Sequence, residues 1–240
     1  MSFARRIVAE GLGTAMLLAV VVGSGIMAER LAGGNVAIAL LANALATGAG
    51  LLALILMFGT ISGAHFNPVV TLSQAAQGNL PGREVLPYIA IQVVGAFAGV
   101  AAAHGMFGEP LFFASEHART GAAQWWSECV ATFGLIAVII GCSRSRPAVT
   151  PFAVAAYITA AYWFTSSTSF ANPAVTLARS ATNTFAGIRP VDTPGFILAQ
   201  LAGAAAATAV FCWLYPAVPA NATAAGTVPA GDFAARAEQQ

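Results

Sequence analysis

The sequence predicts an all-α polytopic membrane protein with six transmembrane helices and two re-entrant half-helices, arranged as an inverted repeat. Three observations predict this fold. The 240 residues are 58% hydrophobic and only 8% charged, with a mean hydropathy of +0.76, whereas a soluble domain carries about 25% charged residues. The chain contains six apolar runs of membrane-spanning length. Finally, the same order of motifs occurs twice along the chain.

The composition excludes several classes of protein. All ten basic residues are Arg and the formal net charge is +1, so the chain has no basic face for nucleic acid. Its three cysteines lie inside apolar runs, at spacings that fit neither a disulfide scaffold nor a zinc site. The sequence shows no nucleophile–base pair, phosphate-binding loop or metal cluster. We therefore expect no enzyme activity, no catalytic residues, no metal and no cofactor.

The apolar runs predict one membrane domain over residues 1–215. Their lengths suit helices that cross about 30 Å of hydrocarbon. The first run follows Arg5 and Arg6 without a cleavage site and is interpreted as a span, not as a signal peptide. Residues 216–240 are rich in Ala, Pro and Gly and are expected to form a flexible tail. The six predicted spans cover residues 7–28, 36–61, 85–107, 124–142, 149–167 and 194–215.

Two further helix-like stretches, at 67–77 and 172–182, are too short to cross a membrane. Each would be only about 16 Å long at 1.5 Å per residue. Both begin with Asn-Pro, which places a capping residue before a proline at the first helical position. Two such half-helices that enter from opposite faces would together complete one additional span.

The chain is an internal repeat, with its first half at about 5–107 and its second at about 124–215. Glu10 corresponds to Glu128, the motif NPVVTL to NPAVTL, and Gln92 to Gln200, in the same order. Each half holds three full spans, an odd number, so the second half must be inverted relative to the first. Inverted repeats place broken helices, and therefore sites, near the membrane midplane.

Two helix N-termini that meet in the middle of a membrane favour neutral solutes over cations. Each carries about half a positive charge and free N–H donors, and a cation about 5 Å away would meet a barrier of about 3 kcal/mol at an effective dielectric near 20. Asn67 and Asn172 would direct their side-chain amides into a shared passage. The unwound backbone before each motif is tolerated at this depth where it lines a water-filled cavity. These features predict a passive pore for small uncharged molecules.

The segments SGAHFNPVVTL and SFANPAVTL, in this repeat, resemble the aquaporin and aquaglyceroporin (major intrinsic protein) superfamily over about residues 5–215. The resemblance implies a homotetramer with one pore per subunit. It also implies that Glu10 and Glu128 hold the re-entrant loops by accepting backbone hydrogen bonds. His65, two residues before Asn67, is a candidate for the inner mouth of the pore, and the alternative is a buried core histidine. The first motif departs from the usual Asn-Pro-Ala. The pore motifs are Asn67, Pro68, Val69 and Asn172, Pro173, Ala174.

The second motif carries a departure that bears on selectivity. The family normally has Arg directly after Asn-Pro-Ala, at the outer constriction, whereas this chain has Val175. The family alignment places the other constriction positions at Thr47, Ala160 and Ser169, so the filter should be wider and less polar. Arg179, one helical turn beyond Val175, is a candidate for restoring positive charge in the outer vestibule. The alternative is that Arg179 extends to the membrane interface or pairs with a loop carboxylate.

With Val in place of the filter Arg, this chain resembles the bacterial aquaporins that are associated with arsenic resistance. The implied solutes are arsenite, methylated arsenicals and glycerol-sized molecules. Two alternatives remain open: a water-selective channel of the same fold, and a proton-coupled secondary transporter that uses Glu10 or Glu128. Five Arg on one side of the predicted topology against three on the other favour an orientation with both termini in the cytoplasm. The expected location is the plasma (inner) membrane.

Overall fold

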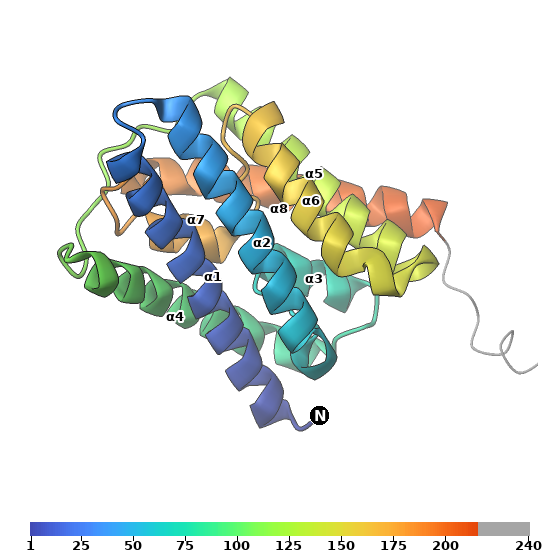
Figure 1. Ribbon diagram of the computed structural model, residues 1–240. Helices are drawn as coiled ribbons and strands as arrows, with labels where there is room; N and C mark the ends of the chain where they lie inside the picture. The colour runs from blue at the N-terminus through green and yellow to red at the C-terminus, as the bar shows by residue number, and fades with distance from the viewer. Residues whose placement is uncertain (216–240) are drawn as a thin grey trace, which may run out of the picture.

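The computed structural model describes residues 1–215, which fold into one helical bundle (Figure 1). The tail predicted at 216–240 lies outside the described residues. Between 1 and 215 there is no β-strand. The bundle contains α1 (Phe3–Leu31), α2 (Val36–Ser62), α3 (Pro68–Ala76), α4 (Gly82–Phe107), α5 (Ala122–Ser145), α6 (Thr150–Phe164), α7 (Pro173–Arg179) and α8 (Thr193–Leu214), with 3₁₀ turns at Pro147–Val149 and Pro190–Asp192.

Five of these helices, α1, α2, α4, α5 and α8, are long and apolar enough to cross a membrane. The span predicted at 149–167 is shorter: α6 has 15 residues, about 22 Å. It ends because Thr165 is extended (φ −111°, ψ 138°) and starts the approach to the second Asn-Pro motif. The six-helix arrangement predicted from the sequence is confirmed, with this helix shortened.

The half-helix predicted at 172–182 also ends early, at Arg179. The residues that follow turn toward the segment between α4 and α5. There the backbone N–H of Ser115 donates to the carbonyl of Ser180 (3.0 Å), and that of Phe113 donates to the carbonyl of Ala181 (3.1 Å). These carbonyls therefore find partners outside the helix. The first half-helix, predicted at 67–77, is α3 and ends at Ala76.

The two halves of the chain pack in equivalent ways. In the first half α1 packs against α2 and α4, and in the second α5 packs against α6 and α8, while α2 and α6 join the halves. The α1–α4 and α5–α8 pairs approach backbone to backbone: a Cβ on Gly95 would collide with the carbonyl of Gly11, and one on Gly203 with that of Cys129. Figure 1 shows α3 and α7 in the middle of the bundle, where they contact each other.

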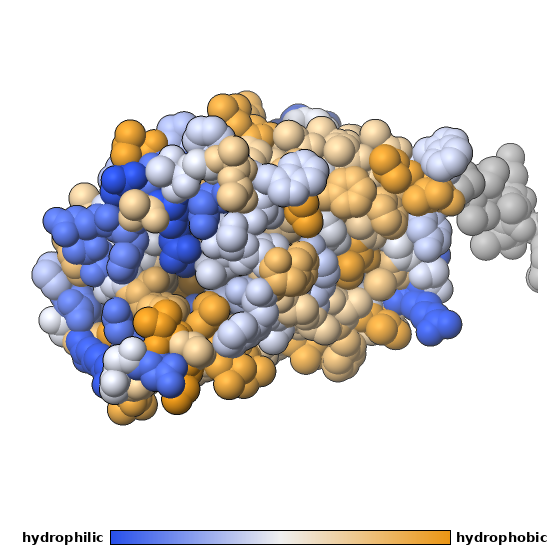
Figure 2. Space-filling model, turned by 90° about the horizontal axis from the view of Figure 1, so that it is seen from above, coloured by the Kyte–Doolittle hydropathy of each residue, from blue (hydrophilic) through white to orange (hydrophobic). Residues whose placement is uncertain are grey.

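The surface of the bundle is largely apolar. Large hydrophobic side chains such as Leu45, Leu56, Val94, Leu198 and Trp213 are exposed on the long helices. In Figure 2 hydrophobic residues cover the middle of the visible face, and hydrophilic residues gather mainly at its left end. An apolar belt between polar ends is the surface expected of a multi-pass membrane protein.

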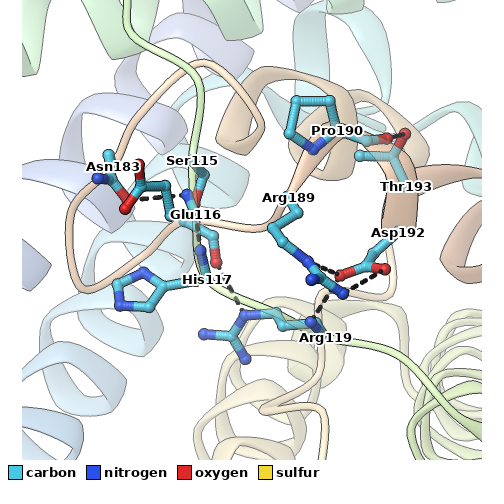
Figure 3. Close-up of polar contacts among 10 residues, drawn as sticks. Ser115, Glu116, His117, Arg119, Asn183, Arg189, Pro190, Asp192 and Thr193 are labelled. Carbon is cyan, nitrogen blue, oxygen red and sulfur yellow. Dashed lines mark hydrogen bonds and ion pairs between the residues drawn. The ribbon is translucent and has the colours of Figure 1, made fainter.

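The segment between α4 and α5 is fastened to the segment between α7 and α8 (Figure 3). The backbone N–H of Glu116 donates to Asn183 Oδ1 (2.9 Å), and the N–H of Arg189 donates to the carbonyl of His117 (2.8 Å). Asp192 accepts from the backbone N–H of Arg119 (2.8 Å) and from the Arg189 guanidinium (2.9 Å). These bonds give the bundle a fixed polar cover on the side opposite the N-terminus.

Candidate functional site

The two half-helices begin at capping asparagines. Asn67 and Asn172 are extended (φ −156° and −157°), and each is followed by proline. Asn67 Oδ1 accepts from the backbone N–H of Val69 (3.0 Å), and Asn172 Oδ1 accepts from those of Ala174 (3.0 Å) and Val175 (3.3 Å). The side-chain oxygens thus satisfy donors that the first turn leaves free. The amide nitrogens remain available for other partners.

The same asparagines join the two loops to each other. Asn67 Nδ2 donates to the carbonyl of Ala171, and Asn172 Nδ2 donates to the carbonyl of Phe66, both at 2.8 Å. The N-termini of α3 and α7 therefore meet tip to tip. A side-chain amide has two N–H donors, so each asparagine keeps one N–H that these cross-loop bonds do not use.

Glu10, fully buried on α1, holds the first loop. Its Oε1 accepts from the Ser62 hydroxyl (2.6 Å) and the backbone N–H of His65 (2.9 Å). Its Oε2 accepts from the backbone N–H of Phe66 and from Gln92 Nε2, both at 2.8 Å. Four donors around one carboxylate compensate for its burial.

Glu128, fully buried on α5, repeats this arrangement for the second loop. It accepts from the backbone N–H groups of Phe170 (2.9 Å) and Ala171 (2.8 Å), and from Gln200 Nε2 (2.7 Å). The Gln200 amide also donates to the Thr176 hydroxyl (2.9 Å), which itself donates to the carbonyl of Asn172 (2.8 Å). The carboxylate, the amide and the half-helix form one connected network.

The glutamines are functional positions that sequence reasoning did not assign. Gln92 and Gln200 were matched as repeat partners, but the network shows their role: each links a carboxylate to a half-helix threonine, Thr71 or Thr176. A buried glutamine at equivalent places in both halves was the available signal.

Both loops contain residues in the left-handed backbone region. Ala64 and Phe66 have φ of 49° in the first loop, and Ser169 and Ala171 have φ of 53° and 48° in the second. Such conformations are strained for residues with a Cβ and persist only where the surroundings enforce them. The backbone N–H bonds to Glu10 and Glu128 provide that enforcement.

A cavity of about 360 Å³ runs beside the meeting point of the half-helices. Asn67 and Asn172 line its middle. Leu80 and Thr150 line it on the side of the N-terminus, and Arg179 lines it on the opposite side. Val69 and Ala174 are fully buried and pack behind the asparagines instead.

Of the four constriction positions expected from the alignment, three line this cavity: Thr47, Ser169 and Val175. The expectation for Ala160 is wrong, because this residue is exposed on the outer face of α6. Tyr162, two positions later, lines the cavity instead. Side chains two positions apart on a helix point about 200° apart around its axis. Tyr162 therefore faces the lumen when Ala160 faces outward.

His65 lines the cavity on the side of the N-terminus. Its Nδ1 lies 3.1 Å from the Thr71 hydroxyl oxygen. The hydroxyl proton of Thr71 is already donated to the carbonyl of Asn67 (3.1 Å), so Nδ1 must carry the proton of its own bond. In the neutral ring, Nε2 is then left as a hydrogen-bond acceptor.

Two arginines enclose Phe170, directly after the predicted filter residue Ser169. The Arg179 guanidinium carbon lies 3.4 Å from the ring centroid, and that of Arg119 lies 5.0 Å away. Arg179 Nε donates to the carbonyl of Ala186, and Arg119 Nε donates to that of Gly187 (2.8 Å). Burial lowers the pKa of Arg119 from its ordinary value.

The described residues contain no group of three or more His, Cys, Asp or Glu side chains that could hold a metal ion. What the site offers is a lumen beside the meeting point of two helix N-termini, with free amide donors at its centre. A membrane-spanning bundle with such a lumen defines a passive channel for solutes.

The chain belongs to the Major intrinsic protein family, which it matches over residues 1–166. It is 56% identical over 216 residues to aquaglyceroporin AqpS of Rhizobium meliloti (strain 1021), covering 90% of this chain and 92% of the relative. It is 33% identical over 149 residues to aquaporin NIP1-3 of Oryza sativa subsp. japonica, covering 61% and 51%. The family resemblance inferred from the two motifs is confirmed, and the protein is a channel, not an enzyme.

The fold has a counterpart among solved structures. The X-ray structure of the aquaglyceroporin from Plasmodium falciparum superposes with a TM-score of 0.64, covering 93% of this chain and all of that one. The identity is 22%, so this likeness supports the shared fold alone. Six helices with two re-entrant half-helices are therefore the established architecture of this chain.

Proposed function

We propose that this channel conducts small uncharged solutes through a widened filter that lacks arginine. The solutes are glycerol-sized molecules, together with arsenite or methylated arsenicals. The observation that carries the proposal is that Val175 lines the cavity with Thr47 and Ser169. An aliphatic side chain and two small hydroxyls leave more space than an arginine would. The 56% identity to a protein named an aquaglyceroporin supports solutes larger than water.

The centre of the lumen suits neutral hydroxylated solutes. The free N–H groups of Asn67 and Asn172 can donate to a hydroxyl oxygen, and the positive ends of α3 and α7 oppose a cation. A neutral solute meets almost none of that electrostatic barrier. Passive flow of uncharged molecules follows from this combination.

Arg179, in our proposal, supplies positive charge in the outer vestibule where the filter position has none. The residue lines the cavity and is only 2% exposed, which argues against an arginine that extends to the membrane interface. Within residues 1–215 no carboxylate lies within 4 Å of its guanidinium. A buried arginine without a counter-ion leaves its charge to act on the lumen.

Proton-coupled transport through Glu10 or Glu128 has less support. Each carboxylate is surrounded by backbone and side-chain donors that hold the loops. Protonation in a transport cycle would remove acceptors from those donors and release the loops from their strained conformation. The bonding pattern supports an anchoring role for both residues.

Assembly and location follow the family resemblance. We propose a homotetramer in the plasma (inner) membrane, with both termini in the cytoplasm. Support for the orientation comes from Arg5, Arg6, Arg83, Arg144 and Arg146, which lie on the side of the N-terminus. Mass measurement of the detergent-solubilised protein tests the assembly, and protease access to an N-terminal tag in oriented vesicles tests the topology.

Side-by-side uptake of water, glycerol and arsenite into proteoliposomes tests the proposed function. We expect permeability to all three above that of empty liposomes, and no accumulation beyond equilibrium when a pH gradient is imposed. Strong water permeability with exclusion of glycerol and arsenite would contradict the widened filter and identify a water-selective channel. Accumulation driven by the pH gradient would contradict passive conduction.

A further inference from the structure

The lumen face of α6 carries a residue that the family alignment does not assign to the filter. Val154, Ile158 and Tyr162 line the cavity, and their spacing of four residues places them on one helix face. Thr150, four residues before Val154, also lines the cavity but on the side of the N-terminus, so Tyr162 brings the one hydroxyl of this helix face that lies beside Thr47. Tyr162 is 3% exposed and lies near the end of α6.

The Tyr162 hydroxyl pairs with a filter residue on another helix. It lies 3.2 Å from the Thr47 hydroxyl of α2, and either oxygen can be the donor. The two groups have two protons between them, and their mutual bond uses one. Neither hydroxyl has another hydrogen-bond partner within the described chain, so one donor remains whichever way the bond points.

Ser169 provides a second unused hydroxyl that lines the same cavity. The residue lines the cavity and is 4% exposed, and its Oγ has no hydrogen-bond partner in the part of the chain that the structure describes. A buried hydroxyl without a partner is costly, and such groups normally have a partner, which water or another molecule in the cavity can supply. Val175, which lines the same cavity, has no polar side-chain atom and cannot supply that partner.

We propose that Tyr162, Thr47 and Ser169 form a binding site for a neutral solute that carries two or more hydroxyl groups, with Tyr162 as its specificity-determining residue. This inference rests on the proposed function and adds the group that recognises the solute. Two unspent donors on different elements can engage two oxygens of one molecule at once. A single water molecule gains less, because it has one oxygen.

The site explains how a filter without arginine can still favour hydroxylated solutes. A polyol or a hydroxylated metalloid acid loses water on entering the lumen, and each hydrogen bond it regains lowers that cost. The tyrosine ring, which lines the same cavity as Val175, offers apolar surface to the carbon or metalloid centre. Width alone would admit solutes by size, whereas this site ranks them by hydroxyl content.

The substitution Tyr162→Phe tests the site, with Tyr157→Phe as the matched control. Phenylalanine keeps the ring and therefore the width of the lumen, and removes only the hydroxyl. Tyr157 lies on the same helix but not at the cavity, and its hydroxyl donates to the carbonyl of Ala131 on α5 (3.1 Å). Glycerol and water permeability are measured for each protein in proteoliposomes and expressed as a ratio, which cancels differences in the amount of folded channel.

We expect Tyr162→Phe to lower the glycerol-to-water ratio about fivefold, the effect of one hydrogen bond, and Tyr157→Phe to leave it unchanged. The glycerol concentration at half-saturation of uptake should rise in Tyr162→Phe. Ser169→Ala should lower the ratio in the same direction, and it provides the test if Tyr162→Phe does not fold.

An unchanged ratio in Tyr162→Phe and Ser169→Ala, in a wild-type background that conducts glycerol, overturns this inference and leaves the proposed function standing. An equal fall in Tyr157→Phe overturns it as well, because the effect would then not come from the lumen. A wild-type protein that passes water but no glycerol overturns the proposed function itself.

Discussion

The side-chain amide of Asn67 donates to the backbone carbonyl of Ala171, 104 residues later in the chain, at 2.8 Å. In the reciprocal bond, the side-chain amide of Asn172 donates to the backbone carbonyl of Phe66. This exchange fixes the two half-helix tips against each other, so neither loop can move without breaking a bond to the other. The asparagines therefore cap their own half-helices and also link the two loops in the middle of the bundle.

The carboxylates that hold these loops should be essential for stability. We expect Glu128→Gln to lower the free energy of unfolding by about 3 kcal/mol, because glutamine has one acceptor oxygen and brings an N–H₂ group against the N–H donors of Phe170 and Ala171. Thermal unfolding in detergent measures the loss. Glu116→Gln, on an exposed segment, is the control and should be neutral. A fully stable Glu128→Gln protein would contradict the anchoring role.

Replacing the filter valine with arginine should narrow the pore. We expect Val175→Arg to reduce glycerol permeability at least about tenfold, a cost of about 1.4 kcal/mol, while water still passes, because the larger side chain fills the lumen beside Thr47 and Ser169. Val175→Leu adds volume without charge and separates the two effects. Stopped-flow permeability measures both solutes. Unchanged glycerol flow in Val175→Arg would place the constriction elsewhere, and equal loss of both solutes would indicate misfolding.

The charge of Arg179 should limit cation leakage. A unit charge about 5 Å from an ion contributes about 3 kcal/mol at an effective dielectric of 20, so we expect Arg179→Gln to raise proton leak at least about tenfold. A pH-sensitive dye inside proteoliposomes measures the leak. Arg30→Gln removes an exposed arginine that pairs with Glu109 at 2.7 Å and controls for net charge. Equal leak in both variants would assign Arg179 a purely structural role.

The contact between the α4–α5 segment and the α7–α8 segment, on the side opposite the N-terminus, should lose stability in acid. Burial alone would raise the pKa of Asp192, but hydrogen bonds from the Arg189 side chain and the Arg119 backbone outweigh it and leave the pKa below its ordinary value. A lowered folded-state pKa means that the contribution of Asp192 is complete above the unfolded pKa of about 3.9 and disappears as pH falls through the folded value.

Asp192→Asn tests this pH dependence. We expect the wild type to be more stable than Asp192→Asn by about 1–2 kcal/mol near neutral pH, the range for a hydrogen bond to a charged group. The difference should shrink below about pH 4. Unfolding curves of both proteins across this range measure it. A difference that stays constant with pH would contradict the role of the ionised carboxylate.

The sequence by itself determined the membrane bundle, the half-helices and the inverted repeat. Apolar length predicts a span because lipid offers no partner for backbone polar groups, and Asn-Pro predicts a helix start because both residues suit that position. Glu10 and Glu128 were assigned their anchoring role through the family resemblance, and the structure provides the bonds. These signals are local or repeated, so they can be recognised without coordinates.

The tertiary structure alone decided which side chain of α6 faces the lumen. Counting along an alignment selected Ala160, whereas the rotation of α6 in the bundle turns that residue outward and brings Tyr162 to Thr47, 115 positions away in the sequence. The enclosure of Phe170 by Arg119 and Arg179 depends on the same kind of long-range packing. The rotation of a helix about its axis is set by all its neighbours together, and for α6, which is apolar on every face, no periodicity in the sequence encodes it.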